Sequence, residues 1–88
     1  MKYAIGNLKM NLLSQTELER YFKSFKNEIR GKKFGKAEII VCPPSVYLKD
    51  FAKEIKNKKV AIGAQNVFPE KRGSYTGEIS PAMVKNIG

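Results

Sequence analysis

The chain has 88 residues, of which 42% are hydrophobic and 28% are charged, so its composition is that of a folded globular chain. It contains no histidine, which excludes a histidine base, a Ser-His nucleophile and a histidine-liganded metal site within these residues. Its 17 Lys and Arg against 8 Asp and Glu give a net charge of +9, which raises nucleic acid or another anionic surface as a partner.

The cysteine count and the amino terminus bear on location. A single cysteine, Cys42, cannot form an internal disulfide, which fits a reducing compartment, and we expect it to be a small buried apolar side chain. No apolar run approaches the roughly 20 residues that span a bilayer. Met1-Lys2 leads at once into the first predicted strand, without the layout of a signal peptide. We therefore expect a cytoplasmic location and no membrane contact.

Residues 4–11 predict a short buried strand that stops at two polar side chains, Asn7 and Lys9. Side chains alternate along a strand, so these two are expected on one face. An amide and an ammonium would then stand together at the carboxyl end of a first strand, where α/β folds bind ligands, and would suit an anionic small molecule. Spacing alone favours the simpler alternative, a strand end that faces water.

A helix is predicted after Leu13. Ser14 and Glu17 fit a capping box, in which the hydroxyl accepts from the Glu17 amide and the carboxylate accepts from the Ser14 amide. Leu13 and Leu18 are spaced for a hydrophobic staple. Apolar residues then recur at helical spacing and form one stripe, which predicts packing against a sheet: Leu18, Tyr21, Phe22, Phe25 and Ile29.

Two further strands and a second helix follow. Residues 38–42 form an apolar β-branched run, typical of a parallel strand covered on both faces, and Pro43-Pro44 ends it. Ser45 is expected to cap a helix whose apolar stripe is Tyr47, Leu48, Phe51, Ala52 and Ile55. Residues 60–64 predict a third strand, with small residues where a neighbour comes close.

The last part of the chain is a long polar loop, 65–78, followed by a helix. Loops of this length are usually functional or disordered. Ser80-Pro81 predicts a capped helix with proline at its first position, and Gly88 stands where a helix C-terminal glycine would. Phe68 and Tyr75 are expected to pack the loop.

Basic residues gather at the two joints between a predicted helix and the next strand: Arg30, Lys32, Lys33, Lys36, Lys56, Lys58 and Lys59. Cations there complement the negative end of a helix dipole. In a βα repeat these joints lie at the amino ends of the strands, on the face opposite Lys9. We therefore interpret most of the charge as a solvated rim.

The order β-α-β-α-β-loop-α predicts an α/β fold of parallel strands joined by right-handed crossovers, with no domain boundary within residues 1–88. It does not distinguish a barrel from an open doubly wound sheet, although neither phosphate-binding glycine motif of the nucleotide-binding folds occurs. Three parallel strands leave both sheet edges unpaired.

The string Gly6-Asn7-Leu8-Lys9-Met10-Asn11 resembles the opening motif of the triosephosphate isomerase family. The stretch from Gly63-Ala64-Gln65-Asn66 to Gly77-Glu78-Ile79-Ser80-Pro81 resembles that family's third loop, and Val41-Cys42-Pro43-Pro44 lies between. The first motif departs at Leu8, where the family most often has tryptophan. The resemblance implies that residues 1–88 are the amino-terminal part of a single TIM-barrel domain, that is, the first three units of a (β/α)8 barrel of roughly 250 residues.

The resemblance also implies an activity. Members of this family, a standard example of tuned acid-base chemistry, interconvert dihydroxyacetone phosphate and glyceraldehyde 3-phosphate through an enediolate, with a glutamate base and a neutral histidine. They need no cofactor or metal and act as homodimers in glycolysis and gluconeogenesis. The histidine, the base and the phosphate-gripping loops match no residue here, so we expect the 88 residues to be inactive without the remaining barrel repeats.

By the same resemblance, Lys9 matches the lysine that binds substrate and offsets its charge, and Asn7 matches the asparagine beside it. Thr76, within Tyr75-Thr76-Gly77-Glu78, matches the loop that crosses the dimer interface. Gln65 and Asn66 are expected to support the site, and Glu78 to be structural.

Two other functions remain open at this stage. One is a small basic nucleic-acid-binding module, suggested by the net charge and the 10% of aromatic residues. The other is a shortened relative that assembles with a full-length barrel through residues 66–78. Neither explains the motif at residues 6–11.

Overall fold

The structure is a computed structural model that describes residues 2–88; Met1 lies outside the described residues. Its strands form one parallel sheet in the order β1-β2-β3, so each strand pairs with its neighbour in sequence. The elements are β1 (Lys2–Asn7), α1 (Gln15–Ile29), β2 (Ala37–Cys42), the 3₁₀ turn η1 (Ser45–Tyr47), α2 (Leu48–Glu54), β3 (Val60–Ile62) and α3 (Pro81–Ile87). The predicted βα alternation is thereby confirmed.

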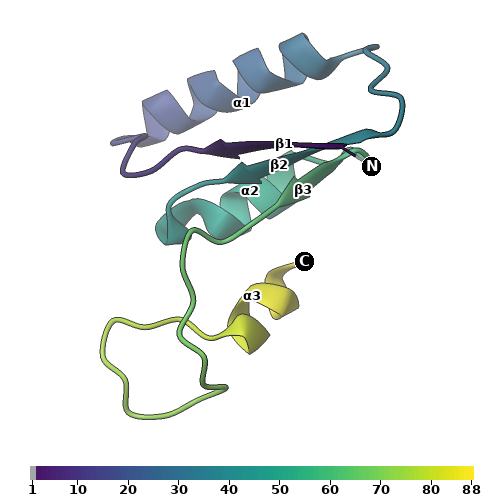
Figure 1. The fold of residues 1–88 in the computed structure, drawn as a ribbon. Helices are drawn as coiled ribbons and strands as arrows, with labels where there is room; N and C mark the ends of the chain where they lie inside the picture. The colour runs from purple at the N-terminus through teal and green to yellow at the C-terminus, as the bar shows by residue number, and fades with distance from the viewer. Residues whose placement is uncertain (1) are drawn as a thin grey trace.

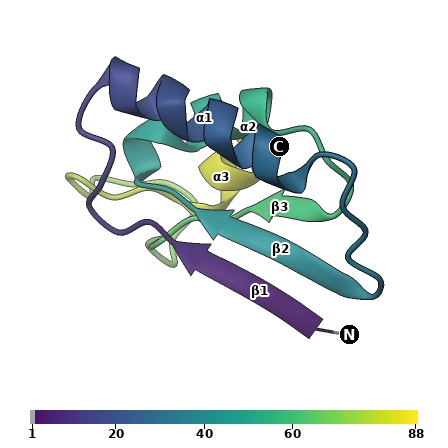
Figure 2. The ribbon, with the colours of Figure 1, turned by 90° about the horizontal axis from the view of Figure 1, so that it is seen from above.

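The molecule is open on one side. Helices α1 and α2 lie on the same face of the sheet, and the other face carries no helix (Figure 2). The loop after β3 and the helix α3 extend away from the sheet (Figure 1). This is the arrangement of successive βα units in a barrel wall, where helices cover only the outer face of the strands.

Strand β1 is exposed along its whole length, so the prediction that it is buried is wrong. Within residues 2–88 it is an edge strand that pairs only with β2, and Tyr3 and Ile5 are 57% and 66% exposed. Strand β3 forms the other edge, as expected for three parallel strands. The described residues therefore leave the apolar side chains of β1 uncovered.

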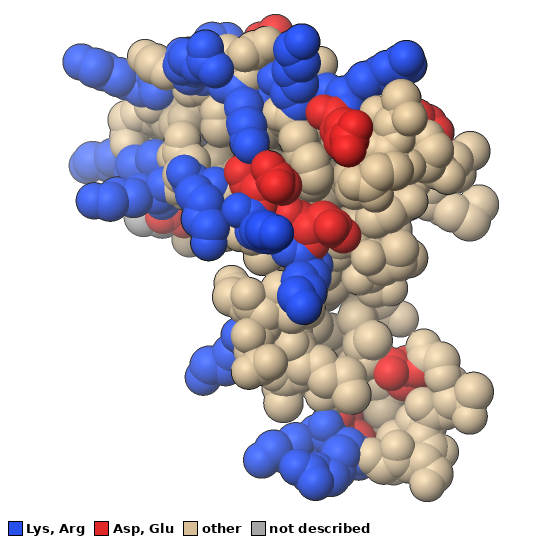
Figure 3. All heavy atoms as spheres, turned by 180° about the vertical axis from the view of Figure 1, so that it is seen from behind, with Lys and Arg blue, Asp and Glu red and all other residues tan. Residues whose placement is uncertain are grey.

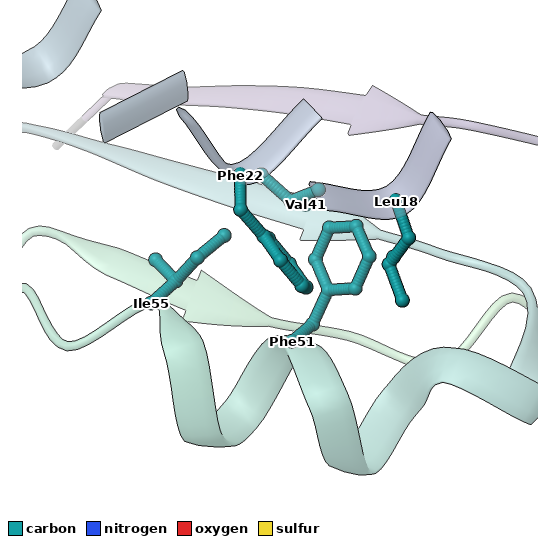
Figure 4. Close-up of a cluster of buried hydrophobic side chains, with 5 residues drawn as sticks. All are labelled: Leu18, Phe22, Val41, Phe51 and Ile55. Carbon is teal, nitrogen blue, oxygen red and sulfur yellow. The ribbon is translucent and has the colours of Figure 1, made fainter. Parts of the chain in front are cut away.

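The core lies between the sheet and the two helices. Leu18 and Phe22 of α1, Val41 of β2, and Phe51 and Ile55 at α2 are buried in one cluster (Figure 4). Phe51 is fully buried, and its ring lies edge-on to that of Phe22, with 4.8 Å between centroids. The predicted apolar stripes of both helices are confirmed.

The amino terminus of α1 differs in detail from the prediction. The Ser14 hydroxyl accepts from the Glu17 amide at 3.2 Å, as predicted. The Glu17 carboxylate, however, accepts from the Leu13 amide at 3.1 Å and not from that of Ser14. The staple is absent, because Leu13 is 80% exposed while Leu12 packs against the core in its place.

Ser45 does not cap a helix. The chain turns through η1 first, where the Tyr47 amide donates to the Pro44 carbonyl at 3.0 Å, and no side chain caps η1 or α2. Proline supplies its fixed φ at the entry to this turn. Helix α2 therefore begins two residues later than the sequence predicted, with Tyr47 and not Ser45 at the N-cap position.

Strand β3 ends at Ile62, two residues earlier than predicted. The expected close approach is present at Gly63, where an added Cβ would lie 2.9 Å from the Cys42 Sγ. Cys42 itself is half-buried rather than fully buried.

Helix α3 begins as predicted. The Ser80 hydroxyl accepts from the Met83 amide at 3.2 Å, and Pro81 is the first helical residue. Gly88 caps the helix with a φ of 124°. Within residues 2–88, no helix combines the length and the apolar character that a membrane crossing requires.

Candidate functional site

The carboxyl ends of the three strands meet at one edge of the sheet. Asn7, the last residue of β1, is in register with Cys42, the last residue of β2. The Leu8 amide donates to the Cys42 carbonyl at 3.0 Å, and the Gly63 amide donates to the Val41 carbonyl at 2.9 Å. The loops that carry the candidate residues therefore leave the sheet side by side.

The loop after β1 contains two non-glycine residues in the left-handed region. Lys9 has a φ of 57° and Leu12 a φ of 71°. For residues with a Cβ this conformation costs roughly 1–2 kcal/mol each. Leu8 and Leu12 pack against the core on either side of the turn, which holds its two ends. Leu8 is thus a packing residue of this turn.

Asn7 and Lys9 are brought together by a hydrogen bond and not by strand alternation. The Asn7 Oδ1 accepts from the Lys9 backbone amide at 2.8 Å. Because β1 ends at Asn7 and the chain then turns left-handed, the period-two rule does not reach Lys9. The prediction that alternation along a strand places Asn7 and Lys9 on one face is therefore wrong. Both side chains are exposed at the same end of the sheet.

Gln65 connects the three strand ends through its side-chain amide. Its Nε2 donates to the Lys9 carbonyl at 2.9 Å and to the Cys42 carbonyl at 3.0 Å. Together with the Asn7 contact, this means that side chains bind both the backbone amide and the backbone carbonyl of Lys9. Gln65 is exposed, so each bond is open to competition from water.

The loop after β3 carries the other predicted residues. The rings of Phe68 and Tyr75 lie 4.5 Å apart, and the Phe68 amide donates to the Ile79 carbonyl at 2.8 Å, so both residues pack the loop as expected. The Glu78 amide contacts the Tyr75 carbonyl at 3.4 Å, and Gly77 has a φ of 79°. These features fit a turn with glycine at its third position.

Thr76 is exposed within that turn, and the loop projects from the sheet (Figure 1). Asn66 is exposed next to Gln65. Within residues 2–88, no hydrogen bond joins Thr76, Asn66 or Glu78 to Asn7 or Lys9. The structure therefore brings Gln65 to the Asn7 and Lys9 turn and leaves these other three apart from it.

The charge distribution separates this end of the sheet from the opposite one. Lys and Arg crowd the end where the strands begin, on the left of Figure 3, as the sequence predicted for the two helix-to-strand joints. The Nζ of Lys26 lies 3.0 Å from a Glu54 carboxylate oxygen and links α1 to α2 there. At the strand carboxyl ends the charged candidate is Lys9.

The chemistry available at the site is electrostatic. An ammonium and side-chain amides can bind an anion, but they provide no base that could remove a proton from carbon at neutral pH. Among residues 2–88, no three His, Cys, Asp or Glu side chains gather in a way that could hold a metal ion.

Sequence reasoning missed the left-handed turn that sets the position of Lys9. The local signal was the pair of asparagines, Asn7 and Asn11, since asparagine side chains bind nearby backbone groups in turns. Asn11 does so through its Nδ2, which donates to the Leu8 carbonyl at 2.6 Å.

Among the curated relatives that resemble this chain are three that are each named triosephosphate isomerase. That of Caldanaerobacter subterraneus subsp. tengcongensis is 54% identical over 56 residues, covering 64% of this chain and 23% of the relative. Those of Thermoanaerobacter pseudethanolicus and Endomicrobium trichonymphae are 41% and 40% identical over 83 residues, covering 94% of this chain and 32% of each relative. The chain thus spans about a quarter to a third of the length of these relatives.

The family model for triosephosphate isomerase matches residues 2–88. The parallel βα order is consistent with this match. The chain belongs to the triosephosphate isomerase family.

Proposed function

We propose that this chain supplies the anion-binding part of a triosephosphate isomerase, which interconverts dihydroxyacetone phosphate and glyceraldehyde 3-phosphate through an enediolate. In this proposal the Lys9 ammonium binds the phosphorylated triose and offsets its negative charge, and Asn7 fixes the turn that carries Lys9. The observation that carries it is the left-handed Lys9, bonded through both backbone polar groups at the carboxyl ends of the strands.

The physical basis is the position of the cation. Coulomb attraction scales inversely with the effective dielectric constant, so an ammonium that faces an enclosed site stabilises a phosphate or an enediolate oxygen far more than one in water. A fixed backbone reduces the reorganisation needed when negative charge develops on the substrate. Lys9 has that fixed backbone here.

The reaction also needs a group that removes a proton from carbon. The sequence contains no histidine, and Glu78 forms no hydrogen bond with the Asn7 and Lys9 turn within residues 2–88. We infer that further βα units of the barrel provide the base and the electrophile. The 88 residues alone are then expected to show no isomerase activity.

A second copy completes the proposal. The loop 66–78 projects from the sheet and places Thr76 at an exposed turn, which suits a contact with another barrel (Figure 1). We infer that the whole enzyme is a homodimer held in part by this loop, and that it works in the cytoplasm. Thr76→Arg should shift a whole barrel carrying this loop from dimer to monomer in sedimentation equilibrium.

A chimeric enzyme tests the proposed function. The 83 residues of the Thermoanaerobacter pseudethanolicus relative that align with this chain are replaced by the matching residues of this chain. We expect the chimera to interconvert the two triose phosphates. Lys9→Met in the chimera should lower kcat/KM by about 10²-fold or more, the usual cost of removing a charge-stabilising group.

Lys23→Met is the matched control, because Lys23 is an exposed lysine of α1 on a different part of the surface. It should leave kcat/KM unchanged. A chimera that folds by circular dichroism but has no activity would refute the proposed function, and full activity of Lys9→Met would refute the role of Lys9. Isomerase activity of the 88-residue chain alone would refute the inference that further units supply the base.

A further inference from the structure

The backbone of Lys9 is held in an unfavourable conformation by a residue 56 positions later in the chain. We propose that Gln65 is a positioning residue for Lys9. Its side-chain amide keeps the Lys9 backbone left-handed and thereby sets the direction of the ammonium and its affinity for anions. The inference rests on the proposed function for its consequence, and on hydrogen bonds and backbone geometry for its cause.

The donors of the Gln65 side chain match the acceptors around it. An amide nitrogen carries two hydrogens, and the Gln65 Nε2 faces two backbone carbonyls, those of Lys9 and Cys42, at 2.9 and 3.0 Å. These two contacts also fix which way the amide is turned. If the Oε1 stood in the position of the Nε2, it would face two carbonyl oxygens and find no donor. A glutamate would fail for the same reason, because an ionised carboxylate has no donor.

The Cys42 carbonyl accepts two hydrogen bonds. It receives the Leu8 amide at 3.0 Å as well as the Gln65 Nε2. The same carbonyl therefore binds the start of the turn that contains Lys9 and the residue that holds the Lys9 carbonyl. The ends of β1 and β2 and the loop after β3 are connected through this one oxygen, so a shift of Gln65 displaces Lys9 relative to the sheet.

The left-handed backbone of Lys9 has an energetic cost. For a residue with a Cβ this cost equals or exceeds what one hydrogen bond contributes. The Asn7 bond to the Lys9 amide alone does not reliably offset this cost. The Gln65 bond to the Lys9 carbonyl makes up the difference. Without Gln65, the Lys9 backbone is expected to sample extended conformations, in which the ammonium points elsewhere.

The test uses Gln65→Met, which keeps the length of the side chain and removes both donors, in the isotope-labelled 88-residue chain. NMR backbone shifts and scalar couplings report the φ of Lys9, and titration with inorganic phosphate reports anion binding through the Lys9 and Asn7 signals. We expect the Lys9 signals of the variant to move toward those of an extended chain. Phosphate affinity should fall about threefold to tenfold, the equivalent of one lost hydrogen bond.

Gln15→Met is the matched control, because Gln15 is an exposed glutamine at the start of α1. It should leave both the Lys9 signals and the phosphate affinity unchanged. Gln65→Glu should behave like Gln65→Met at neutral pH, since shape alone does not restore the donors. Lys9→Gly provides a second measurement: glycine accepts a positive φ without strain, so Gln65→Met should destabilise the Lys9→Gly chain more than the wild-type chain, in which relief of the Lys9 strain offsets part of the lost bond energy.

The outcomes separate the two proposals. Unchanged Lys9 signals in Gln65→Met, or equal destabilisation in both backgrounds, would overturn the positioning role whatever phosphate does. If the Lys9 conformation depends on Gln65 but the wild-type chain gives no phosphate response at Lys9 and Asn7, the positioning role stands and the proposed anion-binding function fails. A phosphate response that survives Gln65→Met together with left-handed Lys9 signals overturns the positioning role and leaves the function intact.

Discussion

Replacing Gly63 with alanine tests the close contact between the ends of β2 and β3. The new Cβ would lie 2.9 Å from the Cys42 Sγ and 3.4 Å from the Ile40 Cγ2, so the two strand ends must separate or the side chains must move. Overpacking of this kind costs about 1–3 kcal/mol. Alanine also reduces the entropy of the unfolded chain, which returns about 0.4–1 kcal/mol. We expect Gly63→Ala to lower the free energy of unfolding by about 1–2 kcal/mol.

A double-mutant cycle with Cys42→Ala isolates the contact. Without the Sγ, the closest neighbour of the new Cβ is Ile40 at 3.4 Å, so Gly63→Ala should cost close to nothing in that background. The coupling energy should therefore be about 1–2 kcal/mol, within the range found for residues in contact. Urea unfolding followed by far-UV circular dichroism measures each free energy.

The control for this cycle is Gly6→Ala. Nothing lies within 4 Å of a Cβ placed at Gly6, so this variant should be neutral or slightly stabilising. If Gly63→Ala costs the same with and without the Cys42 sulfur, the contact is not the cause and the reasoning is refuted.

Three further predictions follow from the core and from the charge. Phe51→Ala should lower the free energy of unfolding by about 3–5 kcal/mol in urea unfolding, because Phe51 is fully buried, whereas Leu13→Ala, at a residue 80% exposed, should change it by less than about 0.5 kcal/mol. Burial raises the pKa of Tyr21 above its ordinary value near 10, so the folded chain keeps this proton where the unfolded chain loses it, and stability should fall as the pH rises above about 10. Tyr21→Phe should lack this part of the pH dependence, and identical curves for both proteins would contradict it. Binding of duplex DNA or single-stranded RNA, measured by fluorescence anisotropy, should be weak and lost at physiological salt, since the net charge of +9 supplies only screened attraction; tight binding at physiological salt would instead favour the nucleic-acid-binding alternative.

Local patterns predicted the fold well where one face of an element meets the core. The α1 stripe and the caps at Ser14 and Ser80 are local features, and the structure has all three. The prediction that strand β1 is buried was wrong. Its apolar residues show that the strand could be buried, but they do not show that another element covers it. Whether a neighbour covers it depends on other elements, and within residues 2–88 β1 pairs only with β2.

The candidate site was predictable in composition but not in geometry. The motif placed Asn7, Lys9 and Gln65 at the strand ends, and the structure has them there. Asn7 and Asn11 indicated a turn, but the left-handed conformations of Lys9 and Leu12 were not predictable, because lysine and leucine do not favour them. These turns depend on Leu8 and Leu12 reaching the core and on Gln65 reaching across from another loop, which are contacts that no short window of sequence contains.

The strand order of the sheet bears on how the chain folds during synthesis. Each strand pairs with the strand next to it in sequence, and the buried cluster uses only residues between Leu18 and Ile55. Domains generally fold from the amino terminus as the ribosome releases the chain. This cluster can therefore assemble before the turn after β3 is released, and Gln65 then bonds Lys9 on a sheet whose first two strands are already paired.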